Sequence, residues 1–130
     1  MTSLKQFAAV AILAMPLASA RSYPSVSVKN MTSRAVSVVV SYASCRGDKF
    51  SVPASTRNAS GAVVAGVAQA PGRRGACLVT GITATYANST PAVTAFASKG
   101  TSYSAYTVRE SAGTVRVWSD HELAELAKKP

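Results

Sequence analysis

The sequence has 130 residues, which leaves room for one domain once a leader has been removed. Fourteen Lys and Arg stand against five Asp and Glu, so the formal net charge is +9 and the protein should attract polyanions. One histidine and so few carboxylates argue against acid–base enzymes and against metal sites.

The chain begins with the three-part layout of a secretory signal peptide. Residues 1–20 contain Lys5 in a short polar start, an apolar run, and the small residues Ala18-Ser19-Ala20. We therefore expect a mature single domain of residues 21–130, secreted and extracellular, with no transmembrane segment. The apolar run is too short to span a bilayer as a helix, and a retained membrane anchor is the alternative.

The mature chain alternates short stretches rich in Val, Ala, Thr and Tyr with clusters of Gly, Pro, Asn and Ser, a pattern typical of strands. In the clearest stretch Val36, Val38, Val40 and Tyr42 alternate with Ser37, Val39 and Ser41, which gives one face for a core and one for water or a second layer. The predicted strands are residues 25–30, 35–44, 49–53, 62–68, 76–87, 92–98, 103–109 and 114–118. This spacing predicts an all-β fold, an antiparallel β-sandwich or a partly closed barrel of seven to eight short strands.

The end of the chain changes character and predicts one short helix over residues 120–128. Ser119 and Glu122 stand at capping-box spacing, which marks a helix start. We expect the apolar side chains of this region to dock the helix on the sandwich: Trp118, Leu123 and Leu126. A membrane-surface role for the segment is the alternative.

Two cysteines are the only candidates for a covalent crosslink. Cys45 and Cys77 lie in a chain that we expect to be exported, where thiols are normally oxidised, so they should form one disulfide bond. Closing the loop between them should stabilise the fold by about 3.7 kcal/mol in the chain-entropy model. Two free structural cysteines are the alternative.

All three asparagines of the chain fall in the acceptor pattern for N-glycosylation: Asn30, Asn58 and Asn88. We therefore expect a glycoprotein that carries surface glycans at one or more of these positions. In a bacterial exported protein the same pattern would have no meaning, and this alternative stays open.

The tripeptide Arg46-Gly47-Asp48, an integrin-binding motif, directly follows Cys45. If Cys45 ends one strand and Lys49 begins the next, the tripeptide lies at a hairpin tip pinned by the disulfide. That position would suit an adhesion ligand, although a Gly-Asp pair between strands is also ordinary turn chemistry.

The sequence contains no recognisable catalytic constellation. Its single histidine is His121, at the predicted helix start, and Asp48 and Glu110 are the only carboxylates outside that helix. We find no metal-ligand spacing and no phosphate-binding glycine loop. We expect no enzyme activity, no metal and no cofactor.

Basic residues concentrate in two loops that the predicted disulfide should bring together. Arg46 and Lys49 follow Cys45, whereas Arg73 and Arg74 precede Cys77. Together they would form one cationic rim, which Arg57 could join, and this rim is the predicted ligand-binding surface. The alternative is that these are solvated loop residues that keep the protein soluble.

Three functional hypotheses follow from the sequence. The first is a binding module whose cationic loops contact an acidic polysaccharide or another anionic surface, with affinity that falls as salt rises. The second is a protein-directed secreted factor, such as an effector, an inhibitor or an adhesion ligand. The third is a structural coat or cell-wall protein that assembles through strand edges. Nucleic acid is a less expected partner, because such modules usually add aromatic platforms among basic residues.

Overall fold

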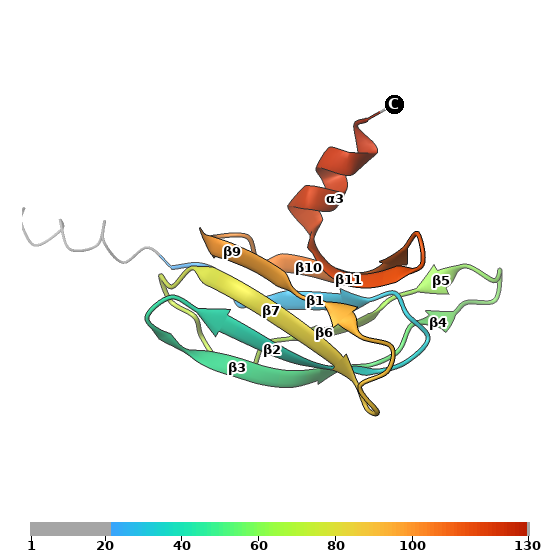
Figure 1. The fold of residues 1–130 in the computed structure, drawn as a ribbon, viewed down its shortest axis with the longest axis horizontal. Coiled ribbons are helices and arrows are strands. Elements are labelled where there is room, and N and C mark those ends of the chain that lie inside the picture. Colours follow the sequence, from blue (N-terminus) through green and yellow to red (C-terminus); the bar gives the residue numbers. More distant parts are fainter. Residues whose placement is uncertain (1–21, 130) are drawn as a thin grey trace, which may run out of the picture.

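The computed structural model describes residues 22–129, so the predicted signal peptide lies outside the described residues. The strands form a five-stranded sheet in the order β6-β1-β10-β11-β8, a four-stranded sheet in the order β3-β2-β7-β9, and the separate β4-β5 hairpin (Figure 1). The strand bounds are β1 Ser27–Asn30, β2 Val36–Tyr42, β3 Cys45–Val52, β4 Thr56–Arg57, β5 Val63–Val64, β6 Gly66–Gln69, β7 Val79–Tyr86, β8 Val93–Thr94, β9 Phe96–Thr101, β10 Ala105–Ser111 and β11 Thr114–Ser119. The prediction of an all-β, sandwich-like fold is confirmed.

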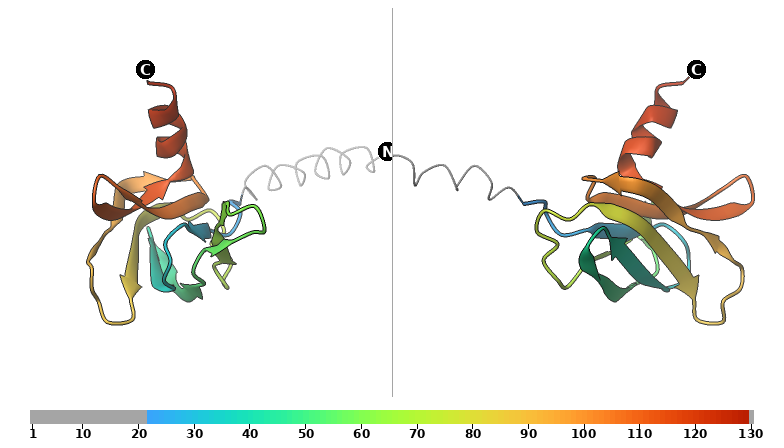
Figure 2. Two further views of the ribbon diagram at one scale, coloured as in Figure 1. Left: turned by 90° about the vertical axis from the view of Figure 1, so that its right-hand side faces the viewer. Right: turned by 60° about the vertical axis from the view of Figure 1, so that its left-hand side comes forward.

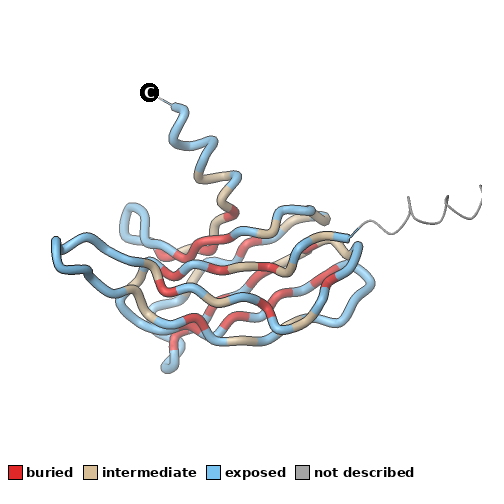
Figure 3. Tube along the Cα trace, turned by 180° about the vertical axis from the view of Figure 1, so that it is seen from behind, coloured by how far each residue is buried: buried red, intermediate tan, exposed pale blue. Residues whose placement is uncertain are grey.

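The core forms between the two larger sheets because their strands alternate apolar and polar residues. In β2, Val36, Val38, Val40 and Tyr42 are buried, whereas each intervening residue is exposed. Figure 3 shows this alternation of buried and exposed positions along the strands. The inward residues of the other strands complete one hydrophobic cluster that includes Val28, Val52, Val79, Ile82, Phe96, Tyr106, Val108 and Val117.

Most strand pairs are antiparallel, but two are parallel. β1 pairs in parallel with β10, so that Val28 lies opposite Tyr106, and β8 pairs in parallel with β11. β1 and β10 are far apart in the sequence, and two other strands, β9 and β10, lie between β8 and β11 along the chain. The alternation of apolar and polar residues within one strand does not show which strand lies beside it. The order of the strands within each sheet was therefore not predictable.

Several strand bounds differ from the prediction. β3 begins at Cys45 rather than at residue 49, and the predicted strand 62–68 divides into β5 and β6. The predicted strand 92–98 likewise divides into β8 and β9. The short strand β4, which was not predicted, pairs with β5 in a hairpin at one end of the molecule (Figure 1).

The helix α3 (Asp120–Ala127) has the predicted capping box. The Ser119 side chain accepts a hydrogen bond from the Glu122 backbone N–H, and the Glu122 carboxylate accepts one from the Ser119 backbone N–H. The expectation that Leu123 and Leu126 dock the helix was wrong, because no residue of α3 is buried and Leu126 is 46% exposed. The helix stands away from the sandwich (Figure 2).

Polar contacts of its first turn hold α3 to the outer face of the first sheet. Asp120 forms an ion pair with Lys29 at 2.9 Å, and Glu122 forms one with Arg116 at 3.1 Å. Within residues 22–129, no helix is long and apolar enough to cross a membrane.

Candidate functional site

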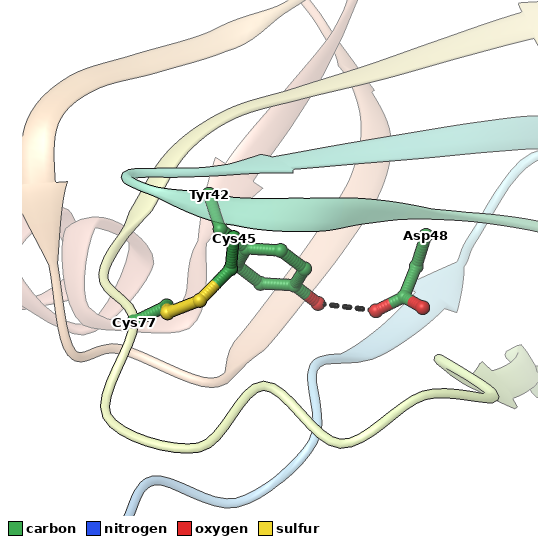
Figure 4. Close-up of a disulfide and its surroundings, with 4 residues drawn as sticks. All are labelled: Tyr42, Cys45, Asp48 and Cys77. Carbon is green, nitrogen blue, oxygen red and sulfur yellow. Dashed lines mark hydrogen bonds between the residues drawn. A yellow bond between two sulfur atoms is a disulfide. The ribbon is translucent and has the colours of Figure 1, made fainter.

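The tripeptide Arg46-Gly47-Asp48 does not lie at a hairpin tip. The turn between β2 and β3 is formed by Ala43 and Ser44, and the tripeptide belongs to β3. The Tyr42 hydroxyl donates a 2.6 Å hydrogen bond to the Asp48 carboxylate (Figure 4). The predicted adhesion motif is therefore corrected to a strand segment whose carboxylate is already bonded within the fold.

The predicted disulfide between Cys45 and Cys77 is present and fixes the loop of residues 70–77 beside β3. The two Cα atoms are 6.2 Å apart, within the range usual for disulfides. A second contact lies further along β3, where a Cβ on Gly72 would lie only 2.7 Å from Oδ1 of Asp48. The disulfide and this close approach together hold the loop along the edge of the sheet.

Arg74 is not part of an exposed rim, which corrects the predicted role of this residue. It is only 2% exposed, and its guanidinium donates to the carbonyls of Tyr103 at 3.0 Å and Ser102 at 2.6 Å, and to the Ser104 hydroxyl. It also lies 5.0 Å from the centre of the Tyr23 ring. Burial lowers the pKa of Arg74 below its usual value. Arg74 is a structural residue that joins three segments.

The three remaining basic residues of this region lie along one border of the sandwich and are all exposed. We call Arg46, Lys49 and Arg73 the cationic edge. Arg46 and Lys49 belong to β3, which is the terminal strand of its sheet, and Arg73 directly follows Gly72 in the adjoining loop. The disulfide thus brings both predicted loops together, but with one arginine fewer than expected.

Arg57 lies elsewhere and cannot join the cationic edge as predicted. It belongs to the β4-β5 hairpin, at the opposite end of the molecule from the turn between β2 and β3 (Figure 1). Its guanidinium donates a 2.7 Å hydrogen bond to the Gly61 carbonyl within the same hairpin. The sequence places Arg57 beside an exposed loop, but it does not show at which end of the sandwich that loop lies.

The charge of the cationic edge is only partly balanced. Asp120, Glu122 and Glu125 of the helix are each within ion-pair distance of a basic partner. No carboxylate among residues 22–129 forms an ion pair with Arg46, Lys49 or Arg73, and their near neighbour Asp48 accepts from Tyr42. This border of the molecule therefore presents a net positive charge to solvent.

A hollow of about 300 Å³ opens beside Arg73. Its lining consists of Ser22, Tyr23, Pro24, Ser25, Arg73 and Gly75. The Tyr23 backbone N–H donates to the Gly75 carbonyl at 2.8 Å, so the N-terminal segment and the loop form one wall. The hollow combines an aromatic ring, hydroxyl groups and a guanidinium next to the cationic edge. Sequence analysis missed it because residues 22–25 carry no motif.

Asn30 is the one predicted glycosylation position that the fold excludes. Its side chain is fully buried, and Nδ2, the atom that would carry a glycan, donates to the carbonyls of Arg34 at 2.7 Å and Pro53 at 3.2 Å. Asn58 and Asn88 are exposed. The Asn88 Oδ1 accepts from Arg34 and from the Thr90 backbone N–H, which leaves Nδ2 outside these two contacts.

The other titratable groups of residues 22–129 do not form a reactive cluster. His121 is exposed and stacks on Tyr103 with ring centres 4.5 Å apart. Asp48 and Glu110 lie in different sheets, on β3 and β10. Within the described part of the chain, no group of three or more His, Cys, Asp or Glu could hold a metal ion.

Two buried tyrosines should make the fold sensitive to alkali. Burial, with a hydrogen bond to Asp48, raises the pKa of Tyr42, and burial raises the pKa of Tyr106 to about 12. Unfolded tyrosine titrates near pH 10, so this stabilisation is complete below about pH 10 and is lost as the pH rises towards the folded values. Urea unfolding at about pH 8, 9.5 and 11 should show stability falling only across the upper interval.

The control for this prediction is Tyr42→Phe. The variant loses one of the two ionisable groups, so its stability should decline less between the two upper pH values than that of the wild-type protein. Equal declines in the two proteins would contradict the assignment to Tyr42.

No protein-family model matches this chain, and neither the curated proteins nor the solved structures contain a significant match.

Proposed function

We propose that the protein is a secreted, non-catalytic binding module for an acidic polysaccharide. The observation that carries the proposal is the juxtaposition of the cationic edge with the hollow beside Arg73. Acidic sugars present carboxylates or sulfates together with hydroxyl groups and apolar ring faces. Arginine and lysine side chains, serine hydroxyls and the Tyr23 ring offer the corresponding partners.

The shape of the surface supports a polymer rather than a compact ligand. Arg46 and Lys49 lie on the border strand β3 and Arg73 in the adjoining loop, so positive charge is distributed along this border of the sheet. Several weak contacts with one chain add together when the repeating charges of a polymer meet such a strip. The disulfide is compatible with the oxidising compartments in which extracellular proteins mature.

The test is retention of the mature chain, residues 21–130, on immobilised polysaccharides at low salt and at about 0.5 M salt. The panel contains polygalacturonate, a sulfated glycan and neutral dextran, with phosphatidylserine liposomes as a separate arm. We expect retention on one acidic polysaccharide, release by salt, and little binding to dextran or liposomes. Arg46→Gln/Arg73→Gln should weaken retention by about 10-fold or more.

A matched control is Arg57→Gln/Lys99→Gln, which removes two positive charges from exposed residues outside the cationic edge. Its retention should stay within about twofold of the wild-type value. Equal losses in the two double variants would contradict a localised site. Absence of retention on every acidic matrix would overturn the proposal and favour a protein partner, and preference for liposomes would replace the polysaccharide by a lipid surface.

A further inference from the structure

A second candidate site lies under the helix α3, on the outer face of the first sheet. A cleft of about 270 Å³ is lined by Arg109, Ser111, Trp118, Leu123, Leu126 and Ala127. The polar contacts of Asp120 and Glu122 fix the first turn of α3, whereas the rest of the helix rises from the sheet, and Leu123 and Leu126 form one side of the cleft. The half-buried Leu123, the exposed Leu126 and the half-buried Trp118 form an apolar wall.

The floor of the cleft has an unbalanced positive charge. Arg109 on β10 and Arg116 on β11 are cross-strand partners, and like charges at opposed positions destabilise a sheet. Arg116 is compensated by Glu122 and lies 4.1 Å from the centre of the Trp118 ring. Arg109 is exposed and forms no ion pair with any carboxylate among residues 22–129. An anion beside Arg109 would supply the missing compensation.

Trp118 adds a hydrogen-bond donor to this region. Its indole Nε1 is buried and has no acceptor within the described residues. A buried donor without an acceptor costs free energy, and most such donors in proteins have a partner. Because this atom is not exposed to solvent, a ligand in the cleft does not reach it directly; the Trp118 side chain itself lines the cleft and adds to its apolar surface.

We propose that this cleft binds a free aliphatic carboxylate of medium chain length. The carboxylate pairs with the Arg109 guanidinium, while the hydrocarbon chain covers Leu123, Leu126 and the accessible part of Trp118. The volume of about 270 Å³ lies just below the usual range of small-molecule sites, which favours a medium chain over a long one. The site is independent of the cationic edge, because it lies on the other sheet.

The chain offers a direct probe, because Trp118 is its only tryptophan. The experiment is a titration of the mature protein with decanoate, below the concentration at which micelles form, while tryptophan emission is recorded. We expect a saturable change in the intensity and wavelength of emission. Decanol, which has the same chain without the charge, should bind about 10-fold more weakly or worse.

Variants distinguish this site from general binding to a basic protein. Arg109→Gln should weaken decanoate binding by about 10-fold or more, because it removes the charge and leaves the apolar wall in place. Leu126→Asp should abolish binding, since it places a negative charge on the exposed wall, and Arg57→Gln should leave binding unchanged. Far-ultraviolet circular dichroism verifies that each variant is folded.

Three results of the titration would overturn the proposal. They are the absence of a saturable emission change, equal affinity of the Arg109→Gln variant and the wild-type protein, and equal affinity for decanol and decanoate. Emission that depends on protein concentration without any ligand would also overturn it, because a second copy of the chain would then cover the cleft. None of these results bears on retention by polysaccharides, so this proposal and the polysaccharide proposal can fail separately.

Discussion

Replacing Arg74 with alanine is expected to lower the free energy of unfolding by about 3–5 kcal/mol. The guanidinium is buried and donates to two backbone carbonyls and one hydroxyl in residues 102–104. Truncation removes three hydrogen bonds from a charged donor, and hydrogen bonds to charged groups are each worth about 1.5–3 kcal/mol. The loss is limited because the Tyr103 carbonyl still accepts from Tyr106 and the Ser102 carbonyl from Ser104. It also removes the contact with the Tyr23 ring, so the loop, the N-terminal segment and residues 102–104, which connect β9 to β10, lose their common partner.

The neighbouring Arg73 is a close control for this measurement. It is exposed, so Arg73→Ala should change the free energy of unfolding by no more than about 0.5 kcal/mol. Urea unfolding followed by tryptophan emission gives both values under one condition. In the polysaccharide assay the order should be reversed: Arg73→Ala should weaken retention more than Arg74→Ala does. Equal stability of the two variants would contradict the interior position of Arg74.

Asn30→Asp is expected to destabilise the protein by about 3–5 kcal/mol at neutral pH. Asn30 uses both ends of its amide, since Nδ2 donates to two carbonyls and Oδ1 accepts from the backbone N–H and hydroxyl of Thr32. Aspartate keeps the acceptor but places a second carboxylate oxygen against carbonyls that need a donor. The loss should shrink at low pH, where a protonated carboxyl regains one donor.

Asn58→Asp makes the same chemical change at an exposed position. There only Oδ1 is used, as an acceptor from Ser60 and Ala62, and a carboxylate preserves that role. We expect a change in the free energy of unfolding within about 0.5 kcal/mol.

Mass spectrometry of protein secreted by a eukaryotic host should also find Asn30 without a glycan. A glycan on Asn30, or equal losses in the two variants, would contradict the buried amide network.

The class of fold was predictable because alternation is a local property of each strand. Val36, Val38 and Val40 specify an inner face whatever the neighbouring strand is, and the capping box at Ser119 likewise involves only adjacent turns. The start of β3 was not predictable from turn chemistry. Gly47 and Asp48 favour a turn, but a register shift opposite Val40 and Tyr42 accommodates them within the strand.

The candidate site was predictable only in outline, because the fate of each side chain depends on contacts distant in sequence. Arg73 and Arg74 are neighbours of the same type, yet Arg73 is exposed to solvent whereas Arg74 donates to the carbonyls of residues 102 and 103. The motif around Asn30 is indistinguishable from that around Asn58 until Pro53 is placed beside it. The cleft under α3 was missed because the sequence suggested that its leucines were covered.

The parallel pairing of β1 with β10 has a consequence for the order in which the domain assembles. β1 lies between β6 and β10, so the strand nearest the N-terminus acquires its second neighbour only when residues 105–108 are available. Because the chain is synthesised from its N-terminus, β1 must remain incompletely paired until almost the whole domain has been synthesised. Such long-range closure slows folding. Exposed backbone groups of β1 would be the part of the nascent chain most in need of protection until then.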